Sequence, residues 1–245
     1  MGFLIFRGWR TTTTETVATN LSPTANMLSD TYVSKMPSHK KGAMRFSEYY
    51  VKGRDGALHV DEGYQNYDLS VSLVLLNATV DKRYSVNAWA DGTGKLISSD
   101  DLTKAYKASV KSEVTWQRVK TSTGYYDTAS ITFNCQPYMV EAVDSQITMT
   151  ATGAILNSGN MVSFPLIQIN GSGDVSFSIN GKAISIDDMT ANVPVYIDCE
   201  NGYVYTASGA TSINGEIPYF DLGTNTITFG NNLTSLVITP HWRWI

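Results

Sequence analysis

The residues that could support acid–base or metal chemistry are few in this sequence and lie far apart. The three histidines are His39, His59 and His241, and none has a second histidine four residues away. Asp100-Asp101 and Asp187-Asp188 are adjacent acidic pairs in turn-like sequence, where carboxylates usually face solvent. Glycoside hydrolysis needs two carboxylates that face each other across a cleft, roughly 5–10 Å apart, and adjacency does not provide this. We therefore expect no catalytic residues and no enzymatic activity.

The two cysteines, Cys135 and Cys199, lie in apolar, strand-like sequence. This context favours buried free thiols, with a disulfide as the alternative. Two cysteines and three scattered histidines offer no recognisable zinc-ligand spacing. The glycine-rich stretch 170–173 lacks the lysine of a phosphate-binding loop and precedes a strand-like segment, so we interpret it as a turn. The sequence thus predicts no metal and no cofactor.

Composition excludes several classes of protein. The chain has 245 residues, of which 42% are hydrophobic and only 16% charged, with a net charge of -4. This length suits one large β domain or two domains of about 100–150 residues. No basic run favours nucleic-acid binding, no apolar stretch approaches the roughly 20 residues of a membrane span, and the first residues do not form a signal peptide. We expect a protein made and kept in a cytoplasm until assembly or lysis.

Strands are the elements that must position any functional side chain in the first half. Ala43 to Lys52 is predicted as a strand, and Gly53 and Gly56 bracket a tight turn. Ala57 to Val60 is expected to be a short strand, followed by a turn at Asp61-Glu62-Gly63 and a core strand, so that the two strands form a central hairpin. The core strand spans residues 67–76, with Leu69, Val71, Leu73 and Leu75 on one face.

One short helix interrupts this β pattern. Thr79 is expected to cap a helix over residues 80–90. Its inner side would carry Val80, Tyr84, Ala88 and Trp89. Before these elements, the polar, Thr-rich segment 11–26 is interpreted either as a surface loop or as an arm that packs on a neighbouring subunit. A strand over residues 126–135 is expected to end at Gln136-Pro137-Tyr138, where we place a domain boundary.

The second half is a series of short strands separated by strong turn signals. Asn180-Gly181 and Glu200-Asn201-Gly202 each predict a hairpin. Strands at short, regular spacing without a helical period indicate a β-sandwich. The sequence therefore predicts an all-β protein with two domains, residues 1–137 and residues 138–245.

Three tyrosines are the best candidates for a binding surface in this second domain. Val195, Ile197 and Cys199 would face inward, so Tyr196 would face outward, with Tyr203 and Tyr205 across the hairpin. Exposed aromatic rings can stack on sugars, but tyrosines also cover sheet faces or contact other subunits. Trp242 and Trp244, near the end of the chain, are expected in the core or at an interface.

Several segments together resemble the distal tail proteins of long-tailed, siphovirus-type bacteriophages. In the first domain these are the first strand with Arg7-Gly8, the stretch 53–76, Trp89 in its short helix, and residues 133–138. In the second domain, residues 195–205 are similar to the family's IDxxNGxVY hairpin, and residues 222–229 with 238–244 to its GxNxITF and ITPxWR ending. Residues 9–46 do not match the family's usual segment.

The resemblance implies a structural hub at the tip of a phage tail. The first domain, a ring-forming β-sandwich or split barrel with one short helix, would assemble as a homohexamer. The second would be a galectin-like β-sandwich that projects outward. The ring would join the tail tube protein to a tail-tip or tail-associated lysin protein and to receptor-binding proteins in the virion. The alternative function is a module that binds host cell-wall glycans, with Tyr196, Tyr203 and Tyr205 as its contact residues.

Overall fold

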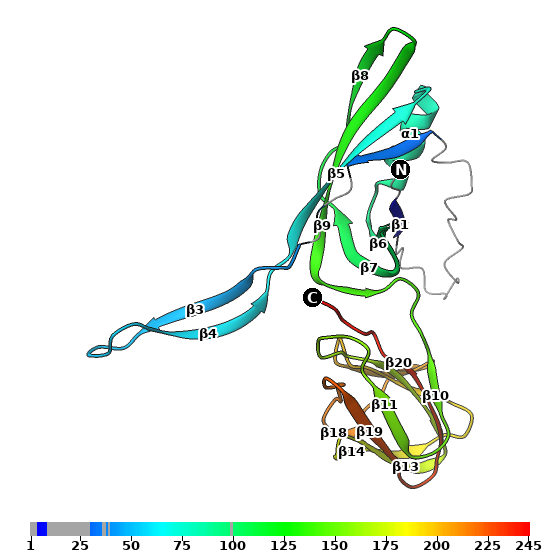
Figure 1. Cartoon of the computed structure of the whole chain (residues 1–245). Helices are drawn as coiled ribbons and strands as arrows, with labels where there is room; N and C mark the ends of the chain where they lie inside the picture. Colours follow the sequence, from blue (N-terminus) through cyan, green and yellow to red (C-terminus); the bar gives the residue numbers. More distant parts are fainter. Residues whose placement is uncertain (1–3, 9–29, 36–37, 39, 99) are drawn as a thin grey trace. The chain divides into compact units, whose positions relative to one another are not determined.

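The computed structural model describes residues 4–8, 30–35, 38, 40–98 and 100–245 (Figure 1). Within them the chain forms one helix and 20 strands, which confirms the all-β prediction. It divides into two compact units, Met1–Ala142 together with Ile245, and Val143–Trp244. The expected boundary after residue 137 lies inside strand β9 (Gly124–Glu141), which continues through Pro137 instead of ending at Cys135. The Thr-rich segment 11–26 and His39 lie outside the described residues.

The first unit is built on a seven-stranded antiparallel sheet with the order β1-β6-β7-β9-β5-β2, to which β8 adds by pairing with β9. The long strand β9 organises this sheet, because it pairs with β5 along one edge and with both β7 and β8 along the other. The other strands are β1 (Leu4–Gly8), β2 (Thr31–Lys35), β5 (Tyr67–Leu76), β6 (Thr93–Ser98), β7 (Asp101–Val110) and β8 (Thr115–Thr121).

One face of this sheet forms the core of the first unit together with helix α1 (Val80–Trp89). The predicted inward side of β5 is confirmed, since Leu69, Val71, Leu73 and Leu75 are all at most 3% exposed. Thr79 is the N-cap of α1, and its hydroxyl accepts a hydrogen bond from the Lys82 backbone N–H at 3.3 Å.

The inner side of α1 differs from the prediction. Val86 and Ala90 are buried against the sheet, and Trp89 packs beside them. Val80 and Tyr84 are 56% and 65% exposed, and Ala88 is exposed as well. The apolar pattern was misleading because a charged residue of the helix, Arg83, turns toward the sheet and binds a buried carboxylate there.

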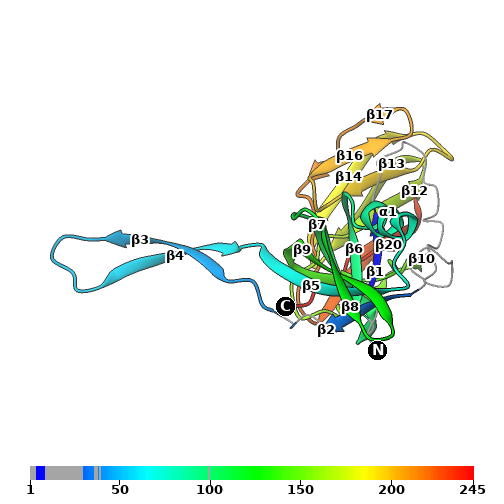
Figure 2. The same ribbon diagram turned by 90° about the horizontal axis from the view of Figure 1, so that it is seen from above.

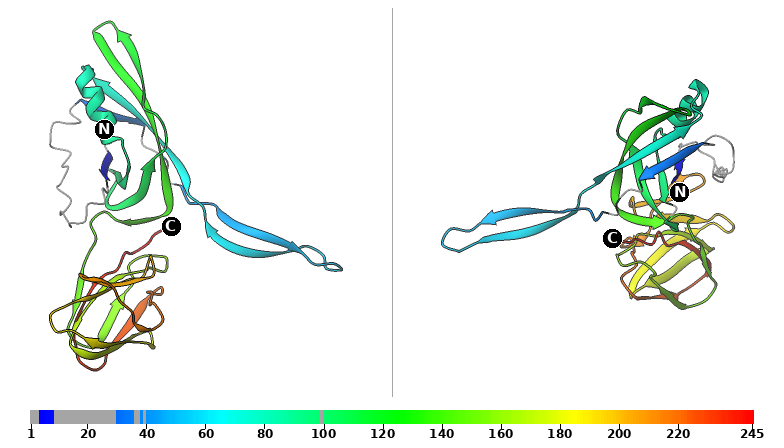
Figure 3. Two further views of the ribbon diagram at one scale, coloured as in Figure 1. Left: turned by 180° about the vertical axis from the view of Figure 1, so that it is seen from behind. Right: turned by 45° about the horizontal axis from the view of Figure 1, so that its top comes forward.

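The segment between β2 and β5 leaves the sheet as a separate ribbon (Figures 2 and 3). Strands β3 (Met44–Tyr50) and β4 (Ala57–Tyr64) pair only with each other. The central hairpin expected between 57–60 and 67–76 is therefore wrong: β4 pairs backward with β3, and β5 pairs with β9 and β2. The turn expected at Asp61-Glu62-Gly63 is instead a bulge within β4, where the register shifts opposite Met44 and Phe46 and Gly63 adopts a φ of 80°.

The second unit is a β-sandwich of two antiparallel sheets. Their strand orders are β10-β20-β12-β15-β16-β17 and β11-β19-β13-β14-β18. The first sheet contains β10 (Ile147–Met149), β12 (Leu166–Gly171), β15 (Val195–Asp198), β16 (Tyr203–Thr206), β17 (Gly209–Ala210) and β20 (Leu233–Thr239). The second contains β11 (Gly153–Leu156), β13 (Gly173–Ile179), β14 (Lys182–Met189), β18 (Asn214–Gly215) and β19 (Thr224–Phe229).

Inward residues of both sheets meet in a single core in this second unit. Ile167, Ile197 and Ile238 come from the first sheet, and Phe177 and Ile227 from the second; each is at most 3% exposed. Trp242, which is 4% exposed, closes the same core and stacks near Phe220. Trp244 is partly buried against it. Of the two positions expected for these tryptophans, core or interface, the structure confirms the core.

Candidate interaction surfaces

The β3–β4 ribbon presents apolar side chains to solvent on one face. The register places Ser47 opposite Val60 and Tyr49 opposite Leu58 on this face. Tyr49, Leu58 and Val60 are 57%, 40% and 52% exposed. The Ser47 hydroxyl donates a hydrogen bond to the Glu62 carboxylate, so the apolar part of this face consists of Tyr49, Leu58 and Val60. Exposed apolar side chains on a projecting ribbon are a feature of protein contact surfaces, and we call these three residues the apolar ribbon face.

The opposite face of the ribbon carries a small polar and aromatic cluster. His59 Nε2 lies 3.4 Å from Glu48 Oε1, and Phe46 stacks on the imidazole with ring centroids 4.9 Å apart. The Tyr50 hydroxyl donates a hydrogen bond to Glu48 Oε2 at 2.9 Å. His59 is thus engaged by one carboxylate and one ring. The side chains of His59 and Glu48 are 56% and 40% exposed, so both are accessible for surface contacts.

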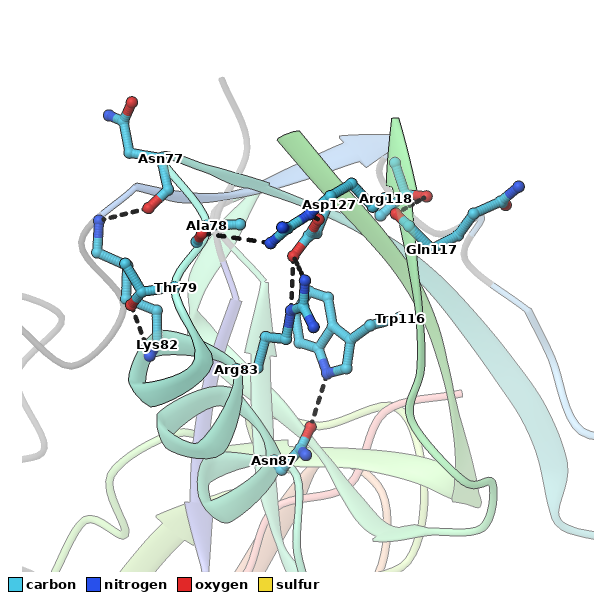
Figure 4. A network of polar contacts seen from close by, with 11 residues as sticks. Asn77, Ala78, Thr79, Lys82, Arg83, Asn87, Trp116, Gln117, Arg118 and Asp127 are labelled. Atoms are coloured by element: carbon cyan, nitrogen blue, oxygen red, sulfur yellow. Dashed lines mark hydrogen bonds and ion pairs between the residues drawn. The ribbon is translucent and has the colours of Figure 1, made fainter. Parts of the chain in front are cut away.

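A network around a buried carboxylate fixes α1 to strands β8 and β9 (Figure 4). The side chain of Asp127 has no exposed surface, and Arg83 contacts its Oδ2 at 2.6 Å while Arg118 Nε donates to Oδ1 at 3.0 Å. Trp116 Nε1 also donates to Asn87 Oδ1 of the helix at 3.0 Å. Two guanidinium groups satisfy the one buried charge, so the network holds the helix in place.

The electrostatics of this network follow from its geometry. Burial by itself would raise the pKa of Asp127, but hydrogen bonds from Arg118 and Arg83 and their positive charges outweigh it and lower the pKa. Sequence reasoning missed this site. Its signal was present, because Asp127 stands at the inward-facing parity of β9, in step with Ala129, Ile131 and Phe133. A charged residue at a core position needs a partner.

The three tyrosines lie on the outer face of the sandwich, as the strand parity predicts. Val195, Ile197 and Cys199 are at most 6% exposed, whereas Tyr203 is 66% and Tyr205 37% exposed. Tyr196 and Tyr205 are cross-strand neighbours, and their rings stack with centroids 5.2 Å apart and an angle of 14°. The structure therefore brings the three candidates together on strands β15 and β16. Their role as contact residues stays a prediction.

The acidic pairs do not form a catalytic arrangement. Asp101 accepts hydrogen bonds from the Thr103 hydroxyl and backbone and from Lys104, which lower the pKa of Asp101 to about 2. Asp187 accepts a hydrogen bond from Asn214 Nδ2 at 2.9 Å. A groove of about 430 Å³ on the second sheet is lined by apolar and uncharged polar residues, with no acid, base or cysteine among them. In the parts of the chain that the structure describes, no three His, Cys, Asp or Glu residues gather as metal ligands.

Both cysteines are buried free thiols, as expected. Burial raises the pKa of Cys135 to about 12, and likewise that of Cys199. His241, near the end of the chain, forms a 3.2 Å hydrogen bond between its Nδ1 and the carbonyl oxygen of Phe164. Among the described residues, the only helix is too short to cross a bilayer.

Comparison with known proteins identifies the fold. No protein-family model matches the sequence, and no curated protein matches it. Among solved structures, the chain is similar to the Dit protein (gp 19.1) of phage SPP1, described as a paradigm of the hub adsorption apparatus in phages that infect Gram-positive bacteria. The similarity covers 100% of both chains with a TM-score of 0.68 and 13% sequence identity.

Two structures of the phage P2 baseplate in its activated conformation, with Ca and with Sr, match more distantly. Each covers 85% of this chain and 90% of the other at 9% identity, with TM-scores of 0.44 and 0.43. The fold assignment rests on the SPP1 protein. The chain is an all-β protein of two compact units. More specifically, it has the fold of a phage distal tail protein, so the resemblance found in the sequence motifs is confirmed at the level of the fold.

Proposed function

We propose that this protein is the structural hub of a phage tail tip, where it forms a hexameric ring and has no enzymatic activity. The observation that carries this proposal is the similarity to the SPP1 Dit protein over the whole of both chains. A match that included only a β-sandwich would be compatible with many functions. Here the similarity covers both units of this chain, the seven-stranded sheet with its helix as well as the sandwich.

The apolar ribbon face supports the part of the proposal that concerns self-assembly. Exposed apolar side chains on a projecting two-stranded ribbon gain free energy when a second protein surface covers them. If the ribbon packs on a neighbouring copy, each copy offers one ribbon and receives another. Such a head-to-tail interface leaves no open end once the ring is closed, and this prevents growth into filaments.

The two units would have different roles in the hub. We assign ring formation and contact with the tail tube protein to the first unit. We assign docking of tail-tip, tail-associated lysin or receptor-binding proteins to the ring and to the second unit, a galectin-like sandwich. The protein would therefore be located in the virion, at the tip of the tail. It would require neither a cofactor nor a metal.

The size of the ribbon's contribution can be estimated from exposure. Full burial of a Leu or Val side chain is worth about 1.5–3 kcal/mol. Leu58 is 40% and Val60 52% exposed, so covering the exposed part should contribute about 1 kcal/mol for each residue. Replacing both by serine should weaken each subunit contact by about 2 kcal/mol, which is roughly a 30-fold change in the contact's equilibrium constant.

The test is the solution mass of the purified full-length chain. Light scattering across a range of concentrations, with negative-stain images of the same fractions, should show rings with a mass near six times 26.9 kDa. The double variant Leu58→Ser with Val60→Ser should dissociate at higher concentrations than the wild type. Leu222→Ser is the matched control, because Leu222 is 59% exposed but belongs to the second unit.

The possible outcomes separate the parts of the proposal. Rings that are lost in the ribbon variant and kept in the control support both the hexamer and the ribbon contact. Rings that are unaffected by the ribbon variant would overturn the role of the ribbon but keep the hub. A chain that stays monomeric at all concentrations, also when mixed with its tail tube protein, would overturn the ring.

A further inference from the structure

The groove on the second sheet of the second unit lies over strands β13 and β14. Core residues alternate along both strands, and Val175 and Ile184 among them are each 1% exposed, so the residues between them point away from the core. Four small residues with that outward orientation line the groove of about 430 Å³: Ser176, Ser178, Ala183 and Ser185. The strand register places the two from β13 directly opposite the two from β14. We call these four residues the groove floor.

Hydrogen bonds and close packing fix both sides of the groove. On one side, Ser176 accepts hydrogen bonds from the Gly230 N–H through its carbonyl oxygen and from the Asn231 N–H through its hydroxyl, both at 2.9 Å. On the other side, β18 lies so close to β14 that a Cβ on Gly215 would be 2.4 Å from the carbonyl oxygen of Ala183. The groove is therefore preformed, which lowers the free-energy cost of binding a ligand there.

The groove floor offers hydroxyl groups but no charge. Among the described residues, no group forms a hydrogen bond with the hydroxyls of Ser178 and Ser185, so each can donate one hydrogen bond and accept another. An extended peptide backbone presents N–H and C=O groups that match these hydroxyls, and the small side chains let it approach the sheet closely. Residues 174–178 of β13 span about 13 Å at about 3.3 Å per residue. This length suits an extended segment of about four or five residues.

Three exposed carboxylates lie at one end of the groove floor. Asp174 on β13 and Asp187 on β14 each stand two residues beyond the floor on the same outward side, and Asp188 is adjacent. Asp174 Oδ1 accepts a hydrogen bond from the Asp188 N–H at 3.2 Å, and Asp187 Oδ2 accepts one from Asn214 Nδ2 at 2.9 Å. In the part of the chain that the structure describes, no Lys, Arg or His pairs with these three carboxylates. We call them the acidic end of the groove.

The charge of the whole second unit favours a basic partner. Residues 143–244 contain eight Asp or Glu and two Lys or Arg, which gives a net charge of -6. Both cations are already paired within the unit, Lys182 with Glu216 at 3.2 Å and Arg243 with Glu200 at 2.9 Å. A surface of this sign repels nucleic acids and anionic lipid headgroups.

We propose that the groove docks an extended basic segment of a partner protein, with its backbone over the groove floor and an arginine or lysine side chain at the acidic end. The three carboxylates of the acidic end all belong to the described residues, and they do not group as metal ligands. A guanidinium on a flexible side chain can instead reach one or two of them and form charge-assisted hydrogen bonds. The inference rests on the docking role proposed for the second unit and names the kind of segment that docks there.

The probe is a positional-scanning library of acetylated, amidated and fluorescently labelled hexapeptides. Fluorescence polarisation with the full-length protein measures which residue is preferred at each peptide position. We expect arginine or lysine to be selected at a position near one end, small residues to be preferred at the others, and glutamate to be disfavoured throughout. The selected peptide should bind at least about threefold more weakly when NaCl is raised from about 50 mM to about 500 mM, because salt screens exposed charges.

Two variants and a matched control locate the binding site. Asp188→Asn removes one charge from the acidic end, and asparagine tolerates the φ of 52° at this position. It should weaken binding of the selected peptide about threefold, the size expected for one exposed ion pair. Ala183→Tyr fills the groove floor at an exposed position and should weaken binding at least about tenfold. Asp221→Asn removes the same charge from an exposed position outside the groove lining and should leave binding unchanged.

Several results would overturn the proposal. One is a library in which no position selects arginine or lysine, and another is equal binding of the selected peptide by the wild type and both variants. Calorimetry with CaCl2 provides a third: calcium that binds the wild type but not Asp188→Asn, without any peptide selection, would make the acidic end a cation site. The fluorescence of Trp242 in the core shows whether Ala183→Tyr is folded, and Asp188→Asn tests the site in either case. The solution mass of the same samples shows independently whether the ring forms, so a failed groove and a failed hub are distinguishable.

Discussion

The buried side chain of Asn225 provides the sharpest test of how the second unit is held together. Asn225 has no exposed surface. Its Oδ1 accepts hydrogen bonds from Asn180 Nδ2 at 2.7 Å and from the Asp221 backbone N–H at 2.8 Å. Its Nδ2 donates to the carbonyl oxygens of Asp221 at 3.0 Å and Gly223 at 3.2 Å. The amide thereby ties the β13–β14 turn to the loop that precedes β19.

Replacing Asn225 by aspartate keeps the shape and removes both donors. Two hydrogen bonds of about 1 kcal/mol each are lost, although Asn157 still donates to both carbonyl oxygens, through Nδ2 to that of Asp221 and through its backbone N–H to that of Gly223. The larger cost is that of burying an unpaired carboxylate. A carboxylate at this position also faces those two oxygens. We therefore expect Asn225→Asp to lower the free energy of unfolding by about 3–5 kcal/mol at pH 7. Such a loss is a large fraction of the stability of a typical domain.

The pH dependence of this loss has a definite sign. Burial and the two facing carbonyl oxygens should raise the pKa of the introduced carboxyl above that of the unfolded chain. The folded variant then binds a proton more readily than the unfolded one, so its stability decreases as the pH rises. The deficit relative to the wild type should be largest at neutral pH and smaller near pH 4, where the protonated carboxyl can again donate one hydrogen bond.

Equilibrium urea unfolding followed by tryptophan fluorescence measures the effect, because Trp242 lies in the core of the same unit. Asn192→Asp is the control, since Asn192 is exposed, belongs to the second unit and has a φ of 62° that aspartate also tolerates. It introduces the same charge without the buried contacts. A loss below about 1 kcal/mol for Asn225→Asp, or a loss equal to that of the control, would refute the reasoning.

Three further predictions concern the other buried groups. Asp127→Asn should lower the free energy of unfolding at pH 7 by about 2–3 kcal/mol, because Arg83 and Arg118 lose their shared carboxylate. The two arginine side chains are 27% and 49% exposed, so the loss is smaller than for a fully buried pair. In chemical denaturation at several pH values this deficit should shrink as the pH falls through the lowered pKa of Asp127, since the wild type then loses the same charge; a deficit independent of pH would contradict this. Gly159→Ala should cost about 1–3 kcal/mol in thermal unfolding, because its Cβ would overlap the backbone carbonyl of Arg243, and an unchanged Tm would argue against that close contact. Cys135 and Cys199 should not react with a thiol reagent at pH 8 in the folded protein and should both react in urea; rapid labelling of the native chain would contradict their burial.

Local sequence determined the elements whose type, bounds and exposed face follow from their own residue pattern. The alternation in residues 67–76 predicts β5 with its bounds, because only one face of that strand can be apolar. Thr79 marks the start of α1 since its hydroxyl satisfies a backbone N–H that the helix leaves unpaired. The outward face of Tyr203 and Tyr205 follows from the same strand periodicity. The motif containing Asn225 was recognised, although its role as a buried connector was not.

Only the tertiary structure decided which strands pair and which charges are buried. The segment 57–64 could have formed a hairpin with β3 or with β5, and both have suitable turns between them. The structure pairs it with β3, whereas β5 pairs along its whole length with β9 and over residues 72–75 with β2, strands that lie far away in the sequence. The inner side of α1 likewise depends on Asp127, which is 44 residues from Arg83. Several strand pairings are locally possible, and the contacts between distant segments select the one that buries their side chains together. A single sequence does not reveal which pairing that is.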